Sequence, residues 1–159
     1  MNRRKAIRQL FVIAGGMMIA TSCLTDSNSA SIELKHIKLS AEDEELLKHL
    51  AEAIIPQTDS PGAANLNLHL FVMKMVDDCH SPEDQEIFIK GLENLKPKKI
   101  KSLKDAQTYL KSWAADDTFL PIVKRRTIQG YLNSEYVMKN KLIYELVPAR
   151  YDGAVKISV

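Results

Sequence analysis

The residues of this chain that could bind a metal ion or act as nucleophiles are few and scattered. They are four histidines and two cysteines: His36, His49, His69, His80, Cys23 and Cys79. No two histidines have the i, i+4 spacing that places two metal ligands on one helix face. Cys79 and His80 are adjacent, and adjacent side chains do not easily point to one ion. The spacing therefore predicts no metal site.

Two pairs of acids, Asp77-Asp78 and Asp116-Asp117, lie where helices are expected to end. Nothing in the sequence indicates a pocket that would perturb their pKa values, so we interpret both pairs as solvated helix ends. The chain also lacks the C-x-x-C-H motif of a c-type cytochrome, a G-x-G-x-x-G motif and a P-loop. We therefore expect a protein that is not an enzyme and that holds no cofactor of its own.

The start of the chain has the layout of a secretory signal. Four bases and no acid accompany an apolar run over residues 10–20, which small residues follow. The run is shorter than the ~20 residues that a membrane-spanning helix needs. Residues 2–8 resemble a twin-arginine export signal with Arg3 and Arg4 as its pair, and a receptor reads such a signal as an address. Residues 1–22 are thus predicted to be a signal peptide.

Residues 20–23, Ala-Thr-Ser-Cys, resemble a lipobox. In that motif the thiol, here of Cys23, is acylated and becomes the mature N-terminus. Several acyl chains hold a protein firmly, because each buried CH2 contributes about 0.8 kcal/mol. Simple cleavage near Ala20 is the alternative. We expect a lipid-anchored protein on the periplasmic side of the cell envelope, exported by the twin-arginine route.

Charge and composition indicate that one domain of ordinary size follows this leader. Without the leader's four bases, the chain carries 18 bases and 20 acids. A nucleic-acid binder needs a clustered basic surface, so we expect no nucleic-acid partner. Residues 23–38 begin with many Ser, Asn, Asp and Thr residues and are predicted to form a flexible tether. Residues 39–159 are predicted to form a single domain.

Apolar residues at helical spacing predict a small all-α bundle of about five helices with an extended C-terminal tail. The first helix is expected to begin after Ser40 and to stop at Pro56. The others are expected over residues 68–78, 82–95, 103–114 and 119–132. In the last of these, Ile122, Ile128 and Leu132 are predicted to face the core.

Several segments of this bundle resemble one protein family. They are GYLNSE at residues 130–135, YELVPARYDG at 144–153, IIP at 54–56, TDSPGA at 58–63 and a helix that ends in Asp78-Cys79. In this order and spacing they resemble the family called gluconate 2-dehydrogenase subunit 3, over residues 39–155. Ala149 and Ala154 depart from the family pattern, which often has Gly and Cys at these places.

The resemblance implies a non-catalytic small subunit of a membrane-associated dehydrogenase that oxidises sugars, sugar acids or polyols. The catalytic partner would be a flavin-dependent oxidoreductase of the glucose-methanol-choline type with bound FAD. A cytochrome c subunit with haem c would take the electrons in some complexes. The small subunit would aid folding, twin-arginine export and membrane attachment of the catalytic subunit. The alternative is a stand-alone helical envelope lipoprotein with a binding role.

The aromatic, Pro-containing tail supplies the predicted contacts with the catalytic partner. They are Tyr131, Tyr144, Pro148, Arg150, Tyr151 and Asp152. Tyr and Arg are favoured at interfaces because they combine contact area with directional bonds. A tail folded back on its own bundle would bury the same aromatic rings, so both arrangements stay open at this point.

Overall fold

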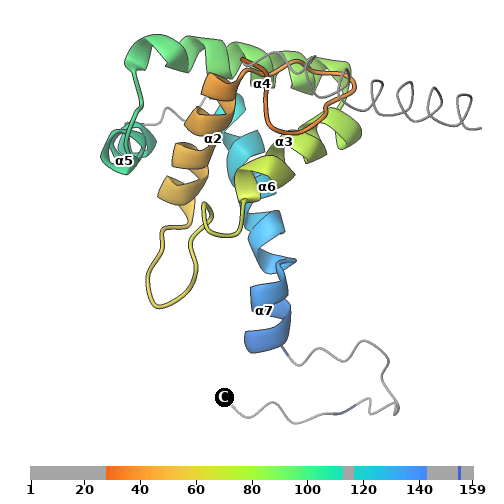
Figure 1. Cartoon of the computed structure of the whole chain (residues 1–159), viewed down its shortest axis with the longest axis vertical. Coiled ribbons are helices and arrows are strands. Elements are labelled where there is room, and N and C mark those ends of the chain that lie inside the picture. Colours follow the sequence, from red (N-terminus) through yellow and green to blue (C-terminus); the bar gives the residue numbers. More distant parts are fainter. Residues whose placement is uncertain (1–27, 113–116, 143–153, 155–159) are drawn as a thin grey trace, which may run out of the picture.

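The computed structural model describes residues 28–112, 117–142 and 154. Within these residues the fold is all-α, which confirms the predicted class, and it has one α-helix and one short 3-10 helix more than the five helices expected (Figure 1). The helices are α2 (Ala41–Ile54), α3 (Leu68–Cys79), α4 (Pro82–Leu95), the 3-10 helix η1 (Lys96–Lys98), α5 (Leu103–Lys111), α6 (Phe119–Leu132) and α7 (Glu135–Asn140). None of the helices in the described part of the chain is both long and apolar enough to cross a lipid bilayer.

Side-chain caps explain where the helices begin. The Ser40 hydroxyl accepts the N–H of Asp43, and the Asp43 carboxylate accepts the N–H of Ser40 in return, which forms a capping box. Ser81 accepts the N–H of Asp84 in the same way, with Pro82 at the first helical position. These two caps confirm the predicted helix starts. α7 begins at another serine cap, Ser134, in a segment for which no helix was predicted.

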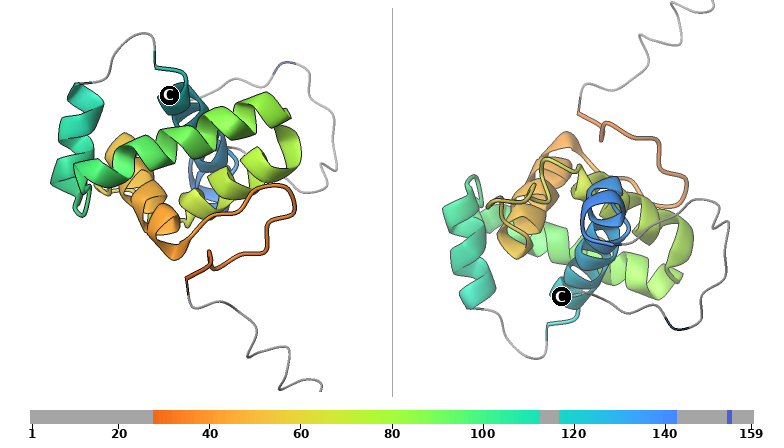
Figure 2. Two further views of the ribbon diagram at one scale, coloured as in Figure 1. Left: turned by 90° about the horizontal axis from the view of Figure 1, so that it is seen from above. Right: turned by 90° about the horizontal axis from the view of Figure 1, so that it is seen from below.

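The main core lies where α2, α3, α4 and α6 meet. Seen from above, α4 crosses the bundle, where it contacts α3 and α6 (Figure 2). The largest fully buried apolar side chains are Phe88, Leu47, Leu50, Met73, Leu92, Val72, Val76 and Val123. The Phe88 and Phe119 rings are 5.6 Å apart, and Phe119 packs directly on Gly91, so α4 and α6 approach closely at this point.

The orientation of α6 differs from the prediction. Its buried line runs through Leu120, Val123, Thr127 and Gly130. Thr127 is tolerated in the core because its hydroxyl donates to the Val123 carbonyl at 2.8 Å. Ile122 packs against the core as expected, but Ile128 and Leu132 are exposed, so their predicted inward placement is wrong.

Candidate functional site

Residues 28–40, which we call the strap, precede α2 and lie on the bundle. Ala30, Ile32 and Leu34 pack against the main core at alternate positions, as in an extended segment, and Ile37 and Leu39 are buried. Backbone bonds from Ala30 to Leu39 and from Ala41 to Asn28 close the strap into a loop. Over residues 28–38 the structure therefore differs from the expected flexible tether, because these apolar side chains find partners on the helices.

Asp77, near the end of α3, holds the strap by its carboxylate. The side chain is fully buried. Its Oδ2 accepts the backbone N–H of Lys35 at 2.8 Å, and its Oδ1 accepts those of His36 at 2.7 Å and Ile37 at 3.0 Å. Figure 2 shows the strap running beside α3, as these bonds require. The expectation of a solvated helix end is wrong for Asp77.

The charge on Asp77 is stabilised despite burial. Burial alone would raise the pKa of this carboxyl, but the three N–H bonds and the Lys74 ammonium, 3.5 Å away, outweigh it. The pKa is lowered from 3.8 to about 2. Backbone N–H groups that donate to a carboxylate favour its charged form, and several of them together lower its pKa.

This pKa predicts how stability depends on pH. The folded-state pKa of Asp77 lies below the unfolded value, so its contribution is fully present above pH 3.8 and is lost as the pH falls toward about 2. One pKa unit corresponds to about 1.4 kcal/mol, so the contribution is about 2.5 kcal/mol. The free energy of unfolding, measured against pH, should fall more steeply through this window in the wild type than in Asp77→Asn. Parallel curves would contradict the assignment.

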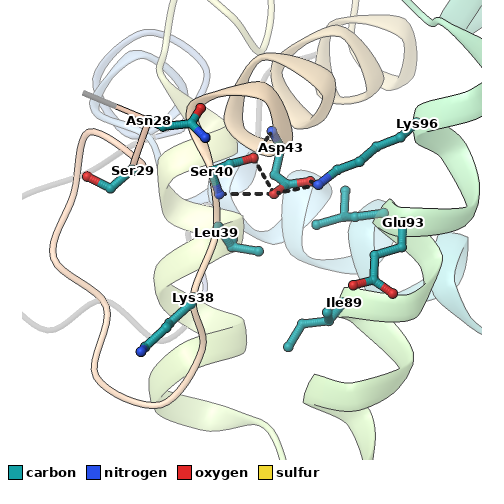
Figure 3. Close-up of a pocket in the computed structure, with 10 residues that line it drawn as sticks. Asn28, Ser29, Lys38, Leu39, Ser40, Asp43, Ile89, Glu93 and Lys96 are labelled. Atoms are coloured by element: carbon teal, nitrogen blue, oxygen red, sulfur yellow. Dashed lines mark hydrogen bonds and ion pairs between the residues drawn. The ribbon is translucent and has the colours of Figure 1, made fainter. Parts of the chain in front are cut away.

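A cleft of about 530 Å³ opens where the strap meets α2, α4 and η1 (Figure 3). Its lining includes Asn28, Lys38, Asp43, Glu93 and Lys96. The Lys96 ammonium lies 3.0 Å from the nearly buried Asp43 carboxylate, which also caps α2. Burial opposes the charge on Asp43, but the Ser40 bonds and Lys96 hold the pKa of this carboxyl below its usual value. The carboxylate and the ammonium therefore stabilise the junction between helices.

Asp117 is also engaged within the bundle. Its Oδ1 accepts the N–H groups of Phe119 and Leu120 at the start of α6, and its Oδ2 accepts the Tyr109 hydroxyl at 3.1 Å. Burial and the neighbouring Asp117 charge raise the pKa of Tyr109 to about 12. The prediction of a solvated helix end is thus wrong for Asp117 as well, whereas Asp116 lies outside the described residues.

His80 joins three helices at its two ring nitrogens. Nε2 accepts the Arg126 Nε–H at 2.8 Å, and Nδ1 lies 3.1 Å from an Asp84 carboxylate oxygen. Because an arginine is always a donor, this geometry assigns the proton of a neutral ring to Nδ1. Both ring nitrogens of His80 therefore have hydrogen-bond partners within the fold.

The other titratable side chains singled out in the sequence lie apart. His69 is buried, and burial lowers the pKa of its ring despite Glu44 at 3.9 Å. His49 lies 3.6 Å from Glu45, and Cys79 is an exposed free thiol. No three His, Cys, Asp or Glu side chains come together as a metal site within the residues that the structure describes.

The predicted contact residues fall mostly outside the described part of the chain. This holds for Arg3, Arg4 and Cys23 of the leader, and for Tyr144, Pro148, Arg150, Tyr151 and Asp152 of the tail. Tyr131 is half-buried and packs against a small second cluster formed by Ala51, Ala63 and Leu68. Its interface role, and the placement of the tail, stay predictions.

The described fold is a small all-α domain with an N-terminal strap. Part of this domain matches the model of a known protein family. Residues 41–102, from the start of α2 to the cap of α5, match the family model described as Gluconate 2-dehydrogenase subunit 3. Over these residues the match supports the family that the sequence motifs indicate. No curated protein and no solved structure gave a significant match to the chain.

Proposed function

We propose that this chain is a non-catalytic accessory subunit of a membrane-associated, flavin-dependent dehydrogenase for sugars or sugar acids. The match of residues 41–102 to a family of dehydrogenase third subunits carries this proposal. It implies association with other dehydrogenase subunits. The side chains that could do chemistry fit an accessory role, since Asp43, Asp77 and His80 are each bonded within the fold.

The catalytic partner in this proposal is a glucose-methanol-choline type oxidoreductase that binds FAD. A cytochrome c subunit with haem c would accept the electrons. The accessory chain would assist the folding of the catalytic subunit, its export and its attachment to the membrane. Its leader supplies the address through Arg3 and Arg4, and an acylated Cys23 supplies the anchor.

The docked strap gives the proposed anchor a mechanical link to the domain. Asn28 lies five residues beyond Cys23, and five residues span at most about 18 Å when fully extended. From Asn28 onward the strap is fastened to α2 and α3 by the bonds of Ala41 and Asp77. An anchor at Cys23 would thus hold the domain, and any partner docked on it, close to the membrane.

Changing both Arg3 and Arg4 to lysine tests the export role. The charge of the leader is unchanged, but a twin-arginine receptor reads the arginine pair. We expect the flavoprotein to be depleted from the envelope fraction and to accumulate inside the cell, measured by its flavin absorbance and dye-linked dehydrogenase activity. Arg8→Lys, outside the pair, is the matched control and should leave the distribution unchanged. A flavoprotein that still reaches the envelope when both arginines are replaced would contradict shared export.

A further inference from the structure

Lysines are concentrated in the turn that joins α4 to α5. Residues 96–104 contain five lysines and no acid. Lys96 is engaged within the fold, since its ammonium pairs with the Asp43 carboxylate. Figure 1 shows this turn at an outer edge of the bundle, where α4 ends and the chain leaves for α5. The other four lysines are exposed, and we call them the lysine corner: Lys98, Lys99, Lys101 and Lys104.

The ammonium groups of the lysine corner form no ion pair with any described residue. Lys98 lies 4.8 Å from the centre of the Tyr109 ring, a cation–π contact that orients the ammonium without neutralising it. Asp105, the next acid along the chain, accepts the Ser102 hydroxyl at 2.7 Å and the Lys101 backbone N–H at 3.3 Å. Its carboxylate therefore caps α5 and pairs with none of the four ammonium groups.

Acids of other helices border the corner in two neighbouring clefts, each of about 420 Å³. Glu42 and Glu45 of α2 line one cleft, and Asp117 lines the other. Glu45 lies 3.1 Å from Lys48 of its own helix, and Asp117 accepts the Tyr109 hydroxyl and two N–H groups of α6. Among the described residues that line these clefts, Glu42 is thus the one acid without an ion pair or hydrogen bond. Most of the positive charge of the corner is left for an external partner.

Lys99 adopts a backbone conformation that favours glycine. Its φ of 48° and ψ of 48° lie in the left-handed region, and its N–H donates to the Lys96 carbonyl at 3.1 Å to close the turn. A Cβ is disfavoured there, whereas glycine adopts the region freely. Strained positions of this kind are found mostly at functional sites. The lysine is unfavourable for the turn, but it adds a cation to the corner.

We infer that the lysine corner binds the anionic headgroups of a lipid surface. A negatively charged membrane attracts exposed lysines near it, and it requires only adaptable point charges, which lysine supplies. A protein partner is disfavoured because protein interfaces are depleted in lysine and are built around arginine or large apolar anchors. The corner has no arginine, and the large exposed hydrophobic residues of the described chain, Ile128, Leu132 and Leu142, lie elsewhere. This inference goes beyond the proposed function, since it requires no catalytic subunit.

Sedimentation of the purified full-length chain with lipid vesicles tests the inference. The vesicles contain phosphatidylcholine, either alone or with an equal part of phosphatidylglycerol. Lys99→Gln with Lys101→Gln removes two cations of the corner. Lys124→Gln with Arg125→Gln is the matched control, because it removes two exposed cations from α6 that also have no ion pair with a described residue.

The corner variant should bind the anionic vesicles at least about tenfold more weakly than the wild type. This estimate follows from a contribution of about fivefold in affinity for each lysine close to an anionic surface. The difference should shrink at high salt, and the α6 control should bind like the wild type. Equal losses in the two double variants would show a general charge effect and would contradict the inference.

Lysine acetylation, read by mass spectrometry, locates the contact on the chain. Anionic vesicles should slow the acetylation of the corner lysines severalfold. Lys35 and Lys124 are exposed lysines of the strap and of α6, and they should react as fast as without vesicles. If the chain binds through another segment, such as the leader, the corner lysines will show no protection and the inference fails.

Lys99→Gly separates lipid binding from stability. Glycine relieves the left-handed conformation, so the melting temperature should rise while binding to anionic vesicles falls severalfold. Wild-type binding by this variant would contradict a role for the corner. A DNA duplex provides the last comparison. Binding to DNA that the corner substitutions abolish, with no preference for anionic over zwitterionic vesicles, would assign the surface to nucleic acid and overturn the inference.

Discussion

Replacing Asp77 with asparagine is expected to lower the free energy of unfolding by about 3 kcal/mol, since breaking a buried charged contact leaves its partners uncompensated. The amide has nearly the same shape, but it is neutral and has one acceptor oxygen for the three N–H groups of Lys35, His36 and Ile37. At least one of these groups would lose its partner. The strap would then detach more readily from α3. Urea unfolding of the purified chain, followed by far-UV circular dichroism, measures the loss.

The neighbouring acid provides the control for this substitution. Asp78 has 35% of its side chain exposed and pairs with the same Lys74 ammonium, at 3.3 Å. An exposed pair of this kind contributes less than about 1 kcal/mol, so Asp78→Asn should be nearly neutral. If Asp77→Asn and Asp78→Asn have equal effects, the strap is not held by the Asp77 carboxylate.

Replacing Gly91 with valine is expected to destabilise the fold by about 3 kcal/mol, the upper part of the range for overpacked cores. A Cβ on residue 91 would lie 2.6 Å from Phe119 Cβ and closer still to the ring. Phe119 is buried against Phe88 and begins α6, so it cannot swing aside without moving the helix. The same urea titration measures the effect.

Two further variants separate overpacking from the general effect of a β-branched side chain on α4. Lys90→Val introduces the same side chain at an exposed position of α4, where only helix propensity and the exposed ion pair with Glu86 are affected, each by less than about 1 kcal/mol. Truncating Phe119 to alanine should cost less in the Gly91→Val background than in the wild type, because the clash is relieved. Additive effects would show that α4 and α6 do not meet at this glycine.

Local sequence signals were sufficient to predict most of the helices. Serine caps and the prolines at residues 56 and 82 act within a few residues of the chain, so the bounds of α2 and α4 followed from the sequence alone. α7 was missed because it is a short helix of six residues without an apolar stripe of its own. The family was also accessible, because its motifs are continuous segments whose order can be compared.

Contacts between distant segments could not be predicted in this way. Asp77 binds N–H groups about 40 residues earlier in the chain, and no local pattern encodes that pairing. The i, i+4 spacing of Met73 and Asp77 does place them on one helix face, but only the structure shows that this face is buried and that the Asp77 carboxylate is bonded there. The outward positions of Ile128 and Leu132 were missed for a related reason, because Thr127 and Gly130 take inner positions that an apolar pattern assigns to larger residues.

The flavin content of the complex is the most direct measure of whether this chain serves as an accessory subunit. The tagged full-length chain would be purified from its native host in mild detergent and its visible absorbance recorded across the elution peak. An oxidised-flavin spectrum that co-elutes with the chain, on a second polypeptide with sugar- or sugar-acid-dependent dye reduction, is the predicted result. A chain that elutes alone and colourless, and whose deletion leaves this dehydrogenase activity in the envelope, would contradict the proposed function.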